Sequence, residues 1–396
     1  ILGSDFAVLN LALKQELENF CTLKHCDLIT LMWSDRPSLP KAQIYAHEKV
    51  YCALSAKEKI ALVRQKMCEL GAENHLISSL DDIAYLTNLR GADVEYNPVF
   101  LSHLLIKQNE TLLFVDEGKI SSALKEELES EGILIYAYES VIEELKRLEN
   151  TTLLIEPAKM TALLVEALNF SVKLVEEINP STHLKAVKGA REISHIEDAM
   201  VEDGVALCRF FAWLEEALEQ KQKINEVDID TRITEFRAKS PFYISNSFAT
   251  IAAFKGNGAF PHYKAERQNC LDIEGDGFLL IDSGGQYKNG TTDITRVVPV
   301  GVLCEEQIHD YTLVLKAHIA ISRAIFPKNI AMPLLDAIAR QPLWEEQLDY
   351  IHGTGHGVGY FLNVHEGPQV LSYFAPVLEK TRAKEGMLSS IEPGIY

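Results

Sequence analysis

The sequence lacks the features that would place the protein in a membrane or on nucleic acid. No apolar run approaches the roughly 18 residues of a transmembrane helix, and no charged-then-apolar signal peptide opens the chain. Positive charge is scarce, because 38 Lys and Arg stand against 57 Asp and Glu and give a formal net charge of −19. We therefore expect neither nucleic acid nor a membrane surface as a partner.

The sequence also lacks the CxxC motif, in which two cysteines are separated by two residues. The seven cysteines are odd in number and form no CxxC pair, which argues against a disulfide framework or a zinc site. They are typical of reduced thiols, so we expect a cytoplasmic protein. Lys255-Gly-Asn-Gly258 lacks the Gly-Lys-Ser/Thr end of a phosphate-binding loop, and we interpret it as a turn that presents His262.

The chain does have the composition of a globular protein. Its 396 residues, 47% hydrophobic and 24% charged, indicate two or three domains. Residues 101–106 and 111–115 predict a hairpin around Gln108-Asn109. Residues 56–70 have helical spacing, with an apolar face formed by Ile60, Val63, Met67 and Leu70.

A longer helix is predicted over residues 195–220. Ser194-His-Ile-Glu197 has the pattern of a capping box that would open it. The residues expected to face the core are Ile196, Met200, Val201, Cys208, Phe211 and Leu218.

Two aspartates stand on strand-like segments further along the chain. The apolar run from Gly277 predicts a buried strand that ends in Asp282, and residues 291–300 predict the returning strand. A lone acid at such a turn is usually a turn former. The hairpin, however, would set Asp282 and Asp293 side by side. Because two like charges cost free energy there, a bound cation is the simplest reason to hold them together.

A glycine-rich run carries two histidines, and a third follows. In His352-Gly-Thr-Gly-His356-Gly-Val-Gly, four glycines alternate with other residues, and His365 lies nine residues beyond His356. Each glycine costs about 0.5–1 kcal/mol inside a helix or strand, so the run predicts a loop with close backbone approach. Glu392 follows in Ile-Glu-Pro-Gly.

Carboxylates combined with an imidazole favour manganese, cobalt, iron or zinc over calcium and magnesium. Two such ions would acidify a shared water and polarise a substrate carbonyl. The residues themselves thus predict a two-metal hydrolase that cleaves an amide without a covalent intermediate.

The order Asp282, Asp293, His356 and Glu392, with Pro261-His262 before the first aspartate, resembles the pita-bread metallopeptidases. More narrowly, nearly the whole chain resembles the three-domain Xaa-Pro aminopeptidases, also called aminopeptidase P. The motifs that carry this resemblance are Trp33-Ser-Asp-Arg-Pro-Ser-Leu-Pro40, Ser79-Leu-Asp-Asp-Ile-Ala-Tyr-Leu86, Asn88-Leu-Arg-Gly-Ala-Asp93, Asn97-Pro-Val-Phe100, Asp282-Ser-Gly-Gly-Gln-Tyr287, Gly290-Thr-Thr-Asp-Ile-Thr-Arg296 and the segment from His352 to Pro368.

The resemblance implies an α/β (α+β) fold, in which a pita-bread catalytic domain with a metal-bearing β-sheet follows a creatinase-like α/β middle domain. The expected divisions are a remnant of an N-terminal α/β domain, a linker, the non-catalytic middle domain and the catalytic domain, at residues 1–35, 36–55, 56–183 and 184–396. The family has a longer first domain and a second bridging glutamate after the Glu-Pro-Gly turn. We therefore expect these residues to be an internal portion of a longer enzyme, with the C-terminal part of the catalytic domain missing.

The resemblance also implies residue roles. Asp282 would be the terminal bidentate ligand of one metal, Asp293 the bridging aspartate, His356 the histidine ligand and Glu392 a glutamate ligand that also takes a proton from the attacking water. The non-ligand catalytic histidines, which would contact the substrate, line the proline pocket and stabilise the tetrahedral species, are His262, His352 and His365.

The predicted activity is release of the N-terminal residue from small peptides with proline in second position, by attack of a metal-bridging hydroxide. The resemblance implies two divalent metals, with manganese preferred and zinc or cobalt as alternatives, and a homodimer. A prolidase acting on Xaa-Pro dipeptides is the nearest alternative. A pita-bread protein that has lost catalysis and binds peptides is the alternative from a different class.

Overall fold

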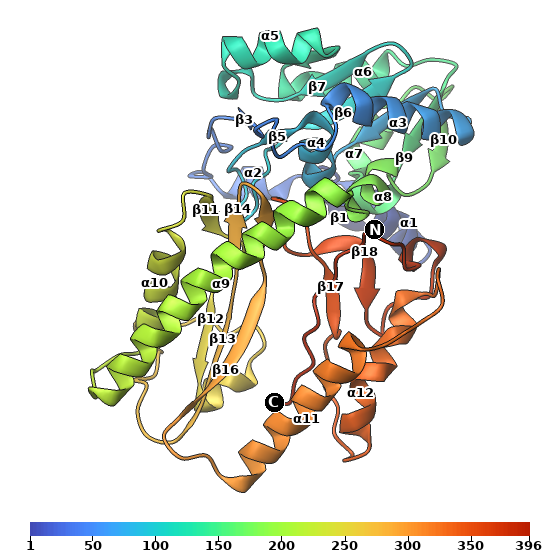
Figure 1. Cartoon of the computed structure of the whole chain (residues 1–396). Coiled ribbons are helices and arrows are strands. Elements are labelled where there is room, and N and C mark those ends of the chain that lie inside the picture. Colours follow the sequence, from blue (N-terminus) through green and yellow to red (C-terminus); the bar gives the residue numbers. More distant parts are fainter. The chain divides into compact units, whose positions relative to one another are not determined.

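A computed structural model describes all 396 residues, which form two compact units (Figure 1). The first unit contains Ile1–Val94 and Pro98–Thr182, and the second contains Glu95–Asn97 and His183–Tyr396. The chain passes from one to the other within helix α8 (Pro180–Ala186).

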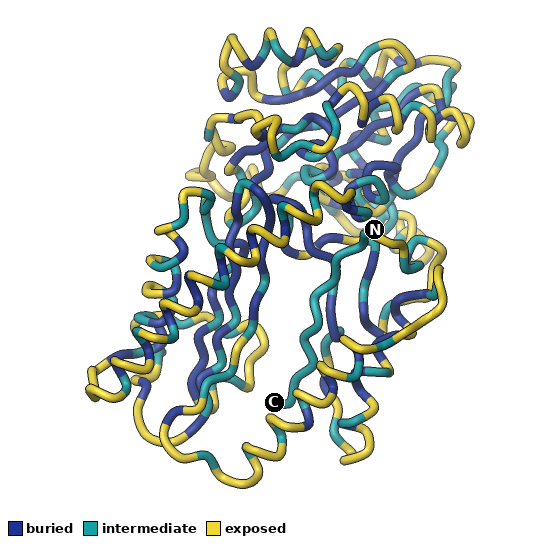
Figure 2. Tube along the Cα trace, viewed as in Figure 1, coloured by how far each residue is buried: buried dark blue, intermediate teal, exposed yellow.

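The first unit is built on a six-stranded mixed sheet with the strand order β10-β9-β4-β6-β7-β8. Its strands are β4 (Asn74–Ile77), β6 (His103–Lys107), β7 (Thr111–Phe114), β8 (Ile133–Tyr136), β9 (Thr152–Ile155) and β10 (Lys173–Glu176). The central strands are buried on both faces, dark blue in Figure 2. Strands β6 and β7 pair antiparallel, which confirms the predicted hairpin.

Seven helices belong to this unit in addition to α8. They are α1 (Leu11–Glu18), α2 (Leu28–Met32), α3 (Ala56–Glu69), α4 (Leu80–Thr87), α5 (Ser122–Ser130), α6 (Val141–Lys146) and α7 (Ala162–Glu166). The remaining short elements are β1 (Leu2–Ser4), β2 (Leu23–His25), β3 (Tyr45–Ala46), β5 (Leu89–Arg90), η1 (Glu117–Lys119), η2 (Tyr138–Ser140) and η3 (Pro157–Lys159). Helix α3 buries Ile60, Val63 and Met67 as predicted, but Leu70 caps its C-terminus and is exposed.

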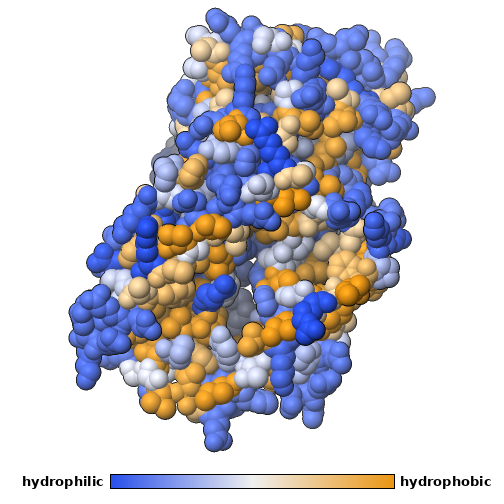
Figure 3. Space-filling view, in the orientation of Figure 1, coloured by the Kyte–Doolittle hydropathy of each residue, from blue (hydrophilic) through white to orange (hydrophobic).

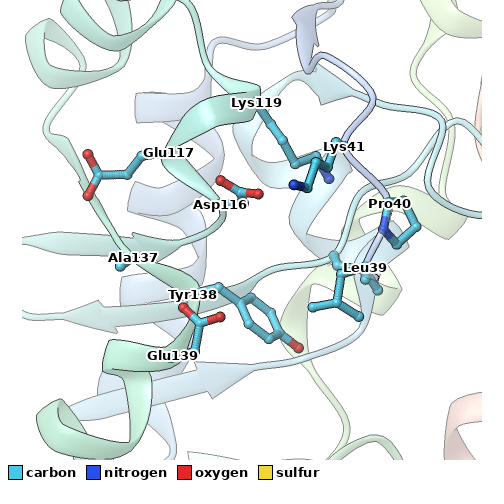
Figure 4. Close-up of a pocket in the computed structure, with 10 residues that line it drawn as sticks. Leu39, Pro40, Lys41, Asp116, Glu117, Lys119, Ala137, Tyr138 and Glu139 are labelled. Carbon is cyan, nitrogen blue, oxygen red and sulfur yellow. The ribbon is translucent and has the colours of Figure 1, made fainter. Parts of the chain in front are cut away.

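A pocket of about 470 Å³ lies in the first unit (Figure 4). Its lining comes from the segment around Pro40, from η1 and from η2, and includes Asp116, Lys119 and Tyr138. None of the predicted site residues lines this pocket.

The second unit contains a three-stranded antiparallel sheet of β12 (Ile251–Phe254), β13 (Gly277–Ser283) and β16 (Ile294–Val300). Helices α9 (Ala190–Glu219) and α10 (Glu226–Arg237) pack on it, as Figure 1 shows, and their apolar side chains form one core with those of the sheet. Two further small sheets pair β11 (Tyr243–Asn246) with β14 (Gly285–Tyr287) and β15 (Gly290–Thr291), and β17 (Gly355–Gly357) with β18 (Glu366–Leu371). The other elements are η4 (Lys255–Ala259), α11 (Glu305–Ser322), η5 (Met332–Leu335), α12 (Asp336–Trp344) and η6 (Glu379–Thr381).

The predicted start of helix 195–220 is wrong, and its predicted core face is right only in part, since Ile196 is buried as expected. Helix α9 begins at Ala190, where the Glu192 carboxylate accepts a hydrogen bond from the Gly189 N–H (2.9 Å). Its buried residues are Ile196, Ala199, Asp203, Ala206, Leu207, Phe210, Leu214 and Ala217, whereas Met200, Val201 and Cys208 are exposed. Phe211 and Leu218 pack only at the edge of the core. The buried stripe of α9 includes an acidic residue, Asp203, so a pattern of apolar residues alone does not reveal it.

The glycine-rich histidine run is not entirely a loop. Residues Gly355–Gly357 form strand β17, paired antiparallel with β18. The expected close approach is present, because a Cβ atom on Gly355 would lie 2.1 Å from the Ser390 carbonyl oxygen.

No helix is long and apolar enough to cross a bilayer. Apolar residues still reach the surface in places, orange in Figure 3. One set forms a stripe along α11, with 44–53% exposure, at Ile308, Tyr311, Leu315 and Ile319. These side chains are separate from the buried side of the helix, which carries Leu313, Ala317 and Ile321.

Candidate metal site

Strands β13 and β16 bring the two aspartates to one end of the sheet. They pair antiparallel, as predicted, with Asp282 opposite Thr295. The Thr295 hydroxyl donates to Asp282 Oδ1 (2.8 Å). Asp293 immediately precedes β16, and only 9% of its side-chain surface is exposed. The connection between the strands contains β14 and β15.

Strand β17 and the C-terminal segment supply an imidazole and a third carboxylate. His356 Nε2 lies 3.0 Å from Glu392 Oε1 and 3.3 Å from Asp293 Oδ2. Ligand atoms of these three residues all lie within 4.8 Å of one another. The Ser390 N–H donates to the His356 carbonyl (2.8 Å), and the Glu392 N–H donates to the Thr354 carbonyl (2.6 Å). These backbone bonds fix Glu392 beside His356.

The hydrogen bonding of His356 leaves its second ring nitrogen facing negative charge. Its Nδ1 lies 2.8 Å from the Gly357 carbonyl oxygen, which can only accept, so Nδ1 carries a proton. In the neutral ring, the lone pair of Nε2 then points toward two carboxylates, and neither Nε2 nor Glu392 Oε1 has a hydrogen-bond partner. A cation removes this conflict. The donor set of imidazole nitrogen and carboxylate oxygens therefore fits a divalent transition metal.

The electrostatics show that this acidic cluster favours bound positive charge. Burial and the nearby Asp293 carboxylate raise the pKa of Asp282 to about 7. Burial lowers the pKa of His356, but its interactions with Asp293 and Glu392 outweigh burial and raise that pKa to about 10. Without a metal, the protein satisfies this acidic site by holding protons.

The three other predicted histidines are placed differently. The His365 ring packs 4.0 Å from that of His356, edge to face, and burial followed by the charge of His356 lowers the pKa of His365. His352 packs against Tyr350 and Tyr396, and its buried Nε2 has no hydrogen-bond partner. His262 is exposed on the segment after η4.

Sequence reasoning missed the hydroxyl groups that hold the ligands. Thr295 bonds Asp282, and Ser390 Oγ accepts from the His356 N–H (3.0 Å). Side chains two residues apart on a strand point to the same face, so the position of Thr295 relative to Asp293 is a usable signal in the sequence. Nothing local pointed to Ser390.

Known families match both parts of the chain. Residues 35–192 match the Creatinase/Prolidase N-terminal domain, and residues 194–396, just over half of the chain, match metallopeptidase family M24. A probable Xaa-Pro aminopeptidase P of Laccaria bicolor is 36% identical over 402 residues, covering 100% of this chain and 62% of that protein. One of Coccidioides posadasii is 40% identical over 381 residues, covering 93% and 58%. The chain thus spans about three fifths of the length of these relatives.

Solved structures show the same architecture. An X-prolyl aminopeptidase from Caenorhabditis elegans, described as a cytosolic enzyme with a di-nuclear active site, has a TM-score of 0.91 and 28% identity, and covers 100% of this chain and 66% of that one. The prolidase from Pyrococcus horikoshii has a TM-score of 0.66 and 26% identity, with 86% and 91% covered. The second unit has the pita-bread fold expected from the sequence. With this fold, and with the family match over residues 194–396, the chain belongs to metallopeptidase family M24.

Proposed function

We propose that the protein is a metal-dependent aminopeptidase that releases the N-terminal residue from peptides with proline in second position. The observation that carries this proposal is the acidic cluster around His356, whose Nε2 faces the carboxylates of Asp293 and Glu392. The names of the relatives supply the substrate class.

Four residues would hold the metals: Asp282, Asp293, His356 and Glu392. We assign Asp282 as a terminal bidentate ligand, Asp293 as a bridging ligand, and the other two as single ligands. When bound, two divalent ions supply an acidified water and a polarised substrate carbonyl. We assign Glu392 to take a proton from that water; its side chain is 32% exposed, against 9% for that of Asp293.

The remaining histidines would act on the substrate. His352 has a buried Nε2 without a hydrogen-bond partner, and His365 packs directly on His356. We assign these two and His262 to contacts around the scissile bond, where an imidazole can donate to a developing oxyanion. A prolyl bond has no N–H and a fixed φ, so a site that relies on metals and a shaped pocket suits it better than one that pairs with an extended backbone.

The metal we propose is manganese, with zinc or cobalt as alternatives. Three carboxylates and one imidazole make an oxygen-rich donor set with a nitrogen, which suits manganese. Metal analysis of the protein purified without chelator measures the stoichiometry, and about two ions per chain are expected. A chain that holds no metal would favour a peptide-binding module without catalysis.

The decisive experiment compares an Xaa-Pro-Yaa tripeptide with the matching Xaa-Pro dipeptide. The full-length protein is treated with chelator, assayed, and assayed again after addition of manganese. We expect manganese-dependent cleavage of the tripeptide. Preferential cleavage of the dipeptide would identify a prolidase. The Laccaria bicolor and Coccidioides posadasii relatives, at 36% and 40% identity, carry the aminopeptidase name, whereas the Pyrococcus horikoshii prolidase is 26% identical.

We also propose that the protein is a cytoplasmic homodimer. The cytosolic description of the Caenorhabditis elegans enzyme and seven free cysteines support the compartment. The exposed apolar stripe of α11 supports association with a second copy. Light scattering should give a dimer that Leu315→Glu weakens and Lys316→Glu, one residue away on the same helix, leaves intact. A monomeric wild-type protein would refute the dimer.

A further inference from the structure

Two buried ion pairs in the second unit have the same composition. In each, an arginine without exposed side-chain surface pairs with an equally buried aspartate: Arg237 with Asp203, and Arg340 with Asp336. Neither pair is among the proposed metal ligands. In both, the aspartate also accepts a hydrogen bond from a threonine that lies close in sequence to a proposed ligand.

The first cluster joins helices α9 and α10 to the connection between the two aspartate strands. Arg237 Nε donates to Asp203 Oδ1 (2.7 Å) and Nη2 to Oδ2 (3.2 Å). The Tyr287 hydroxyl donates to Oδ1 (3.1 Å), and the Thr292 hydroxyl donates to Oδ2. Both oxygens of Asp203 are therefore used twice.

Thr292 passes this support to the proposed ligands. Its Oγ1 accepts from the Gly285 N–H (2.9 Å), and its own N–H donates to the Gly285 carbonyl (2.9 Å). Thr292 directly precedes Asp293, and Gly285, three residues after Asp282, begins β14. One threonine thus fixes the spacing of the chain segments that carry both aspartates.

The second cluster is built in the same way on α12. Arg340 Nε donates to Asp336 Oδ2 (2.9 Å), and the Thr354 hydroxyl donates to Asp336 Oδ1. The Tyr350 hydroxyl is hydrogen-bonded to the Thr354 hydroxyl. Each cluster therefore contains an arginine, an aspartate, a threonine and a tyrosine.

This cluster supports the histidine segment. Arg340 Nη1 donates to the Tyr350 carbonyl (2.6 Å), and Nη2 donates to the His352 carbonyl (2.5 Å). Thr354 lies between His352 and His356, and its carbonyl accepts from the Glu392 N–H (2.6 Å). The backbone that carries the imidazole and the third carboxylate is held at several points from one side.

Stability alone is a weak reason to keep such pairs, because removing two charges from water can cost as much as their attraction returns. In both pairs, the aspartate is held rigidly and accepts a hydrogen bond from one threonine hydroxyl beside the proposed metal site. Groups that orient metal ligands from behind commonly change metal affinity about 10- to 100-fold.

We propose that each Arg–Asp pair is a positioning group, which acts through Thr292 on the aspartate half of the site and through Thr354 on the histidine and glutamate half. The inference rests on the proposed metal binding. The two clusters would together hold the halves of the site at the separation that two metal ions require.

The test measures the dissociation constant for manganese by calorimetry, with chelator-treated full-length protein. Thr292→Val and Thr354→Val remove one hydroxyl each and keep the side-chain shape. Thr292→Ser and Thr354→Ser keep the hydroxyl. Thr87→Val is the matched control, because Thr87 is a buried threonine of the first unit whose hydroxyl bonds the Ile83 carbonyl (2.7 Å).

We expect both valine variants to bind manganese about 10- to 100-fold more weakly, with affinity largely restored in the serine variants and unchanged in the Thr87→Val control. Unchanged affinity in folded valine variants would overturn the proposal, as would serine variants that bind as weakly as the valine ones. If a valine variant does not fold, Tyr287→Phe and Tyr350→Phe remove a hydroxyl from the same clusters and should also bind manganese more weakly. Full manganese affinity in both phenylalanine variants would overturn the proposal. A wild-type protein that binds no manganese would refute the metal site itself.

Discussion

Metal binding is expected to release protons, and the number released should change between pH 8 and pH 6. In the metal-free protein, interactions with Asp293 and Glu392 overcome burial and raise the pKa of His356 to about 10. Burial and the charge of Asp293 raise the pKa of Asp282 to about 7. A metal ion needs the Nε2 lone pair and the ionised carboxylate, so it must displace both protons.

The magnitude follows from these two pKa values. At pH 8, His356 is protonated and Asp282 is mostly ionised, so binding releases about one proton; at pH 6 both are protonated, and binding releases about two. From pH 8 to pH 6, competition between protons and metal at His356 weakens metal binding about 100-fold, and the same competition at Asp282 weakens it about 10-fold more. The apparent dissociation constant should therefore rise about 1000-fold from pH 8 to pH 6.

Calorimetric titration with manganese, in two buffers of different ionisation enthalpy at each pH, counts the released protons directly. Asp282→Asn is the control, because an amide takes up no proton and the count at pH 6 should fall toward one. An equal count at both pH values in the wild-type protein would show that Asp282 does not carry the second proton. Binding without any proton release would refute the electrostatic account of the site.

Three other perturbations give separate tests. Gly355→Ala places a methyl group 2.1 Å from a backbone carbonyl oxygen. It should lower the free energy of unfolding in urea by about 1–3 kcal/mol and also weaken metal binding. The control Gly204→Ala, where no atom lies near the new methyl group on helix α9, should stabilise the protein by up to about 1 kcal/mol. Burial lowers the pKa of both His75 and His103 to about 4, so the unfolded state binds more protons than the folded state between pH 6.5 and 4. The free energy of unfolding should therefore fall by about 2 kcal/mol for each histidine as the pH drops from 7 to 5. An unchanged urea midpoint would contradict this. The buried Glu226 carboxylate accepts hydrogen bonds from two backbone N–H groups and from two side chains, and these bonds shape the segment after η4 that carries His262. Glu226→Gln should therefore speed trypsin cleavage of that segment without lowering the melting temperature by more than a few degrees.

The strands that carry Asp282 and Asp293 could be predicted because their signals are local. An apolar run, a turn rich in glycine and a second run of alternating residues define a hairpin within about 25 residues, and the structure has that hairpin. The core face of α9 could not be predicted in this way. Its buried stripe includes Asp203, which is tolerated only because Arg237 pairs with it from another helix. A pairing across 34 residues leaves no periodic pattern in the sequence.

In the segment from His352 to Gly359, the glycines led to the incorrect prediction of a loop throughout. Gly355 is not among the glycines with positive φ, and β17 is an extended strand. The absence of a side chain is needed here for space, since the Ser390 carbonyl crosses close above Gly355. The sequence indicated that something approaches the backbone but could not identify it, because Ser390 lies 35 residues away along the chain. That crossing is also what brings Glu392 within 3.0 Å of His356. The same steric requirement that made the segment look like a loop therefore assembles the imidazole and carboxylate half of the site.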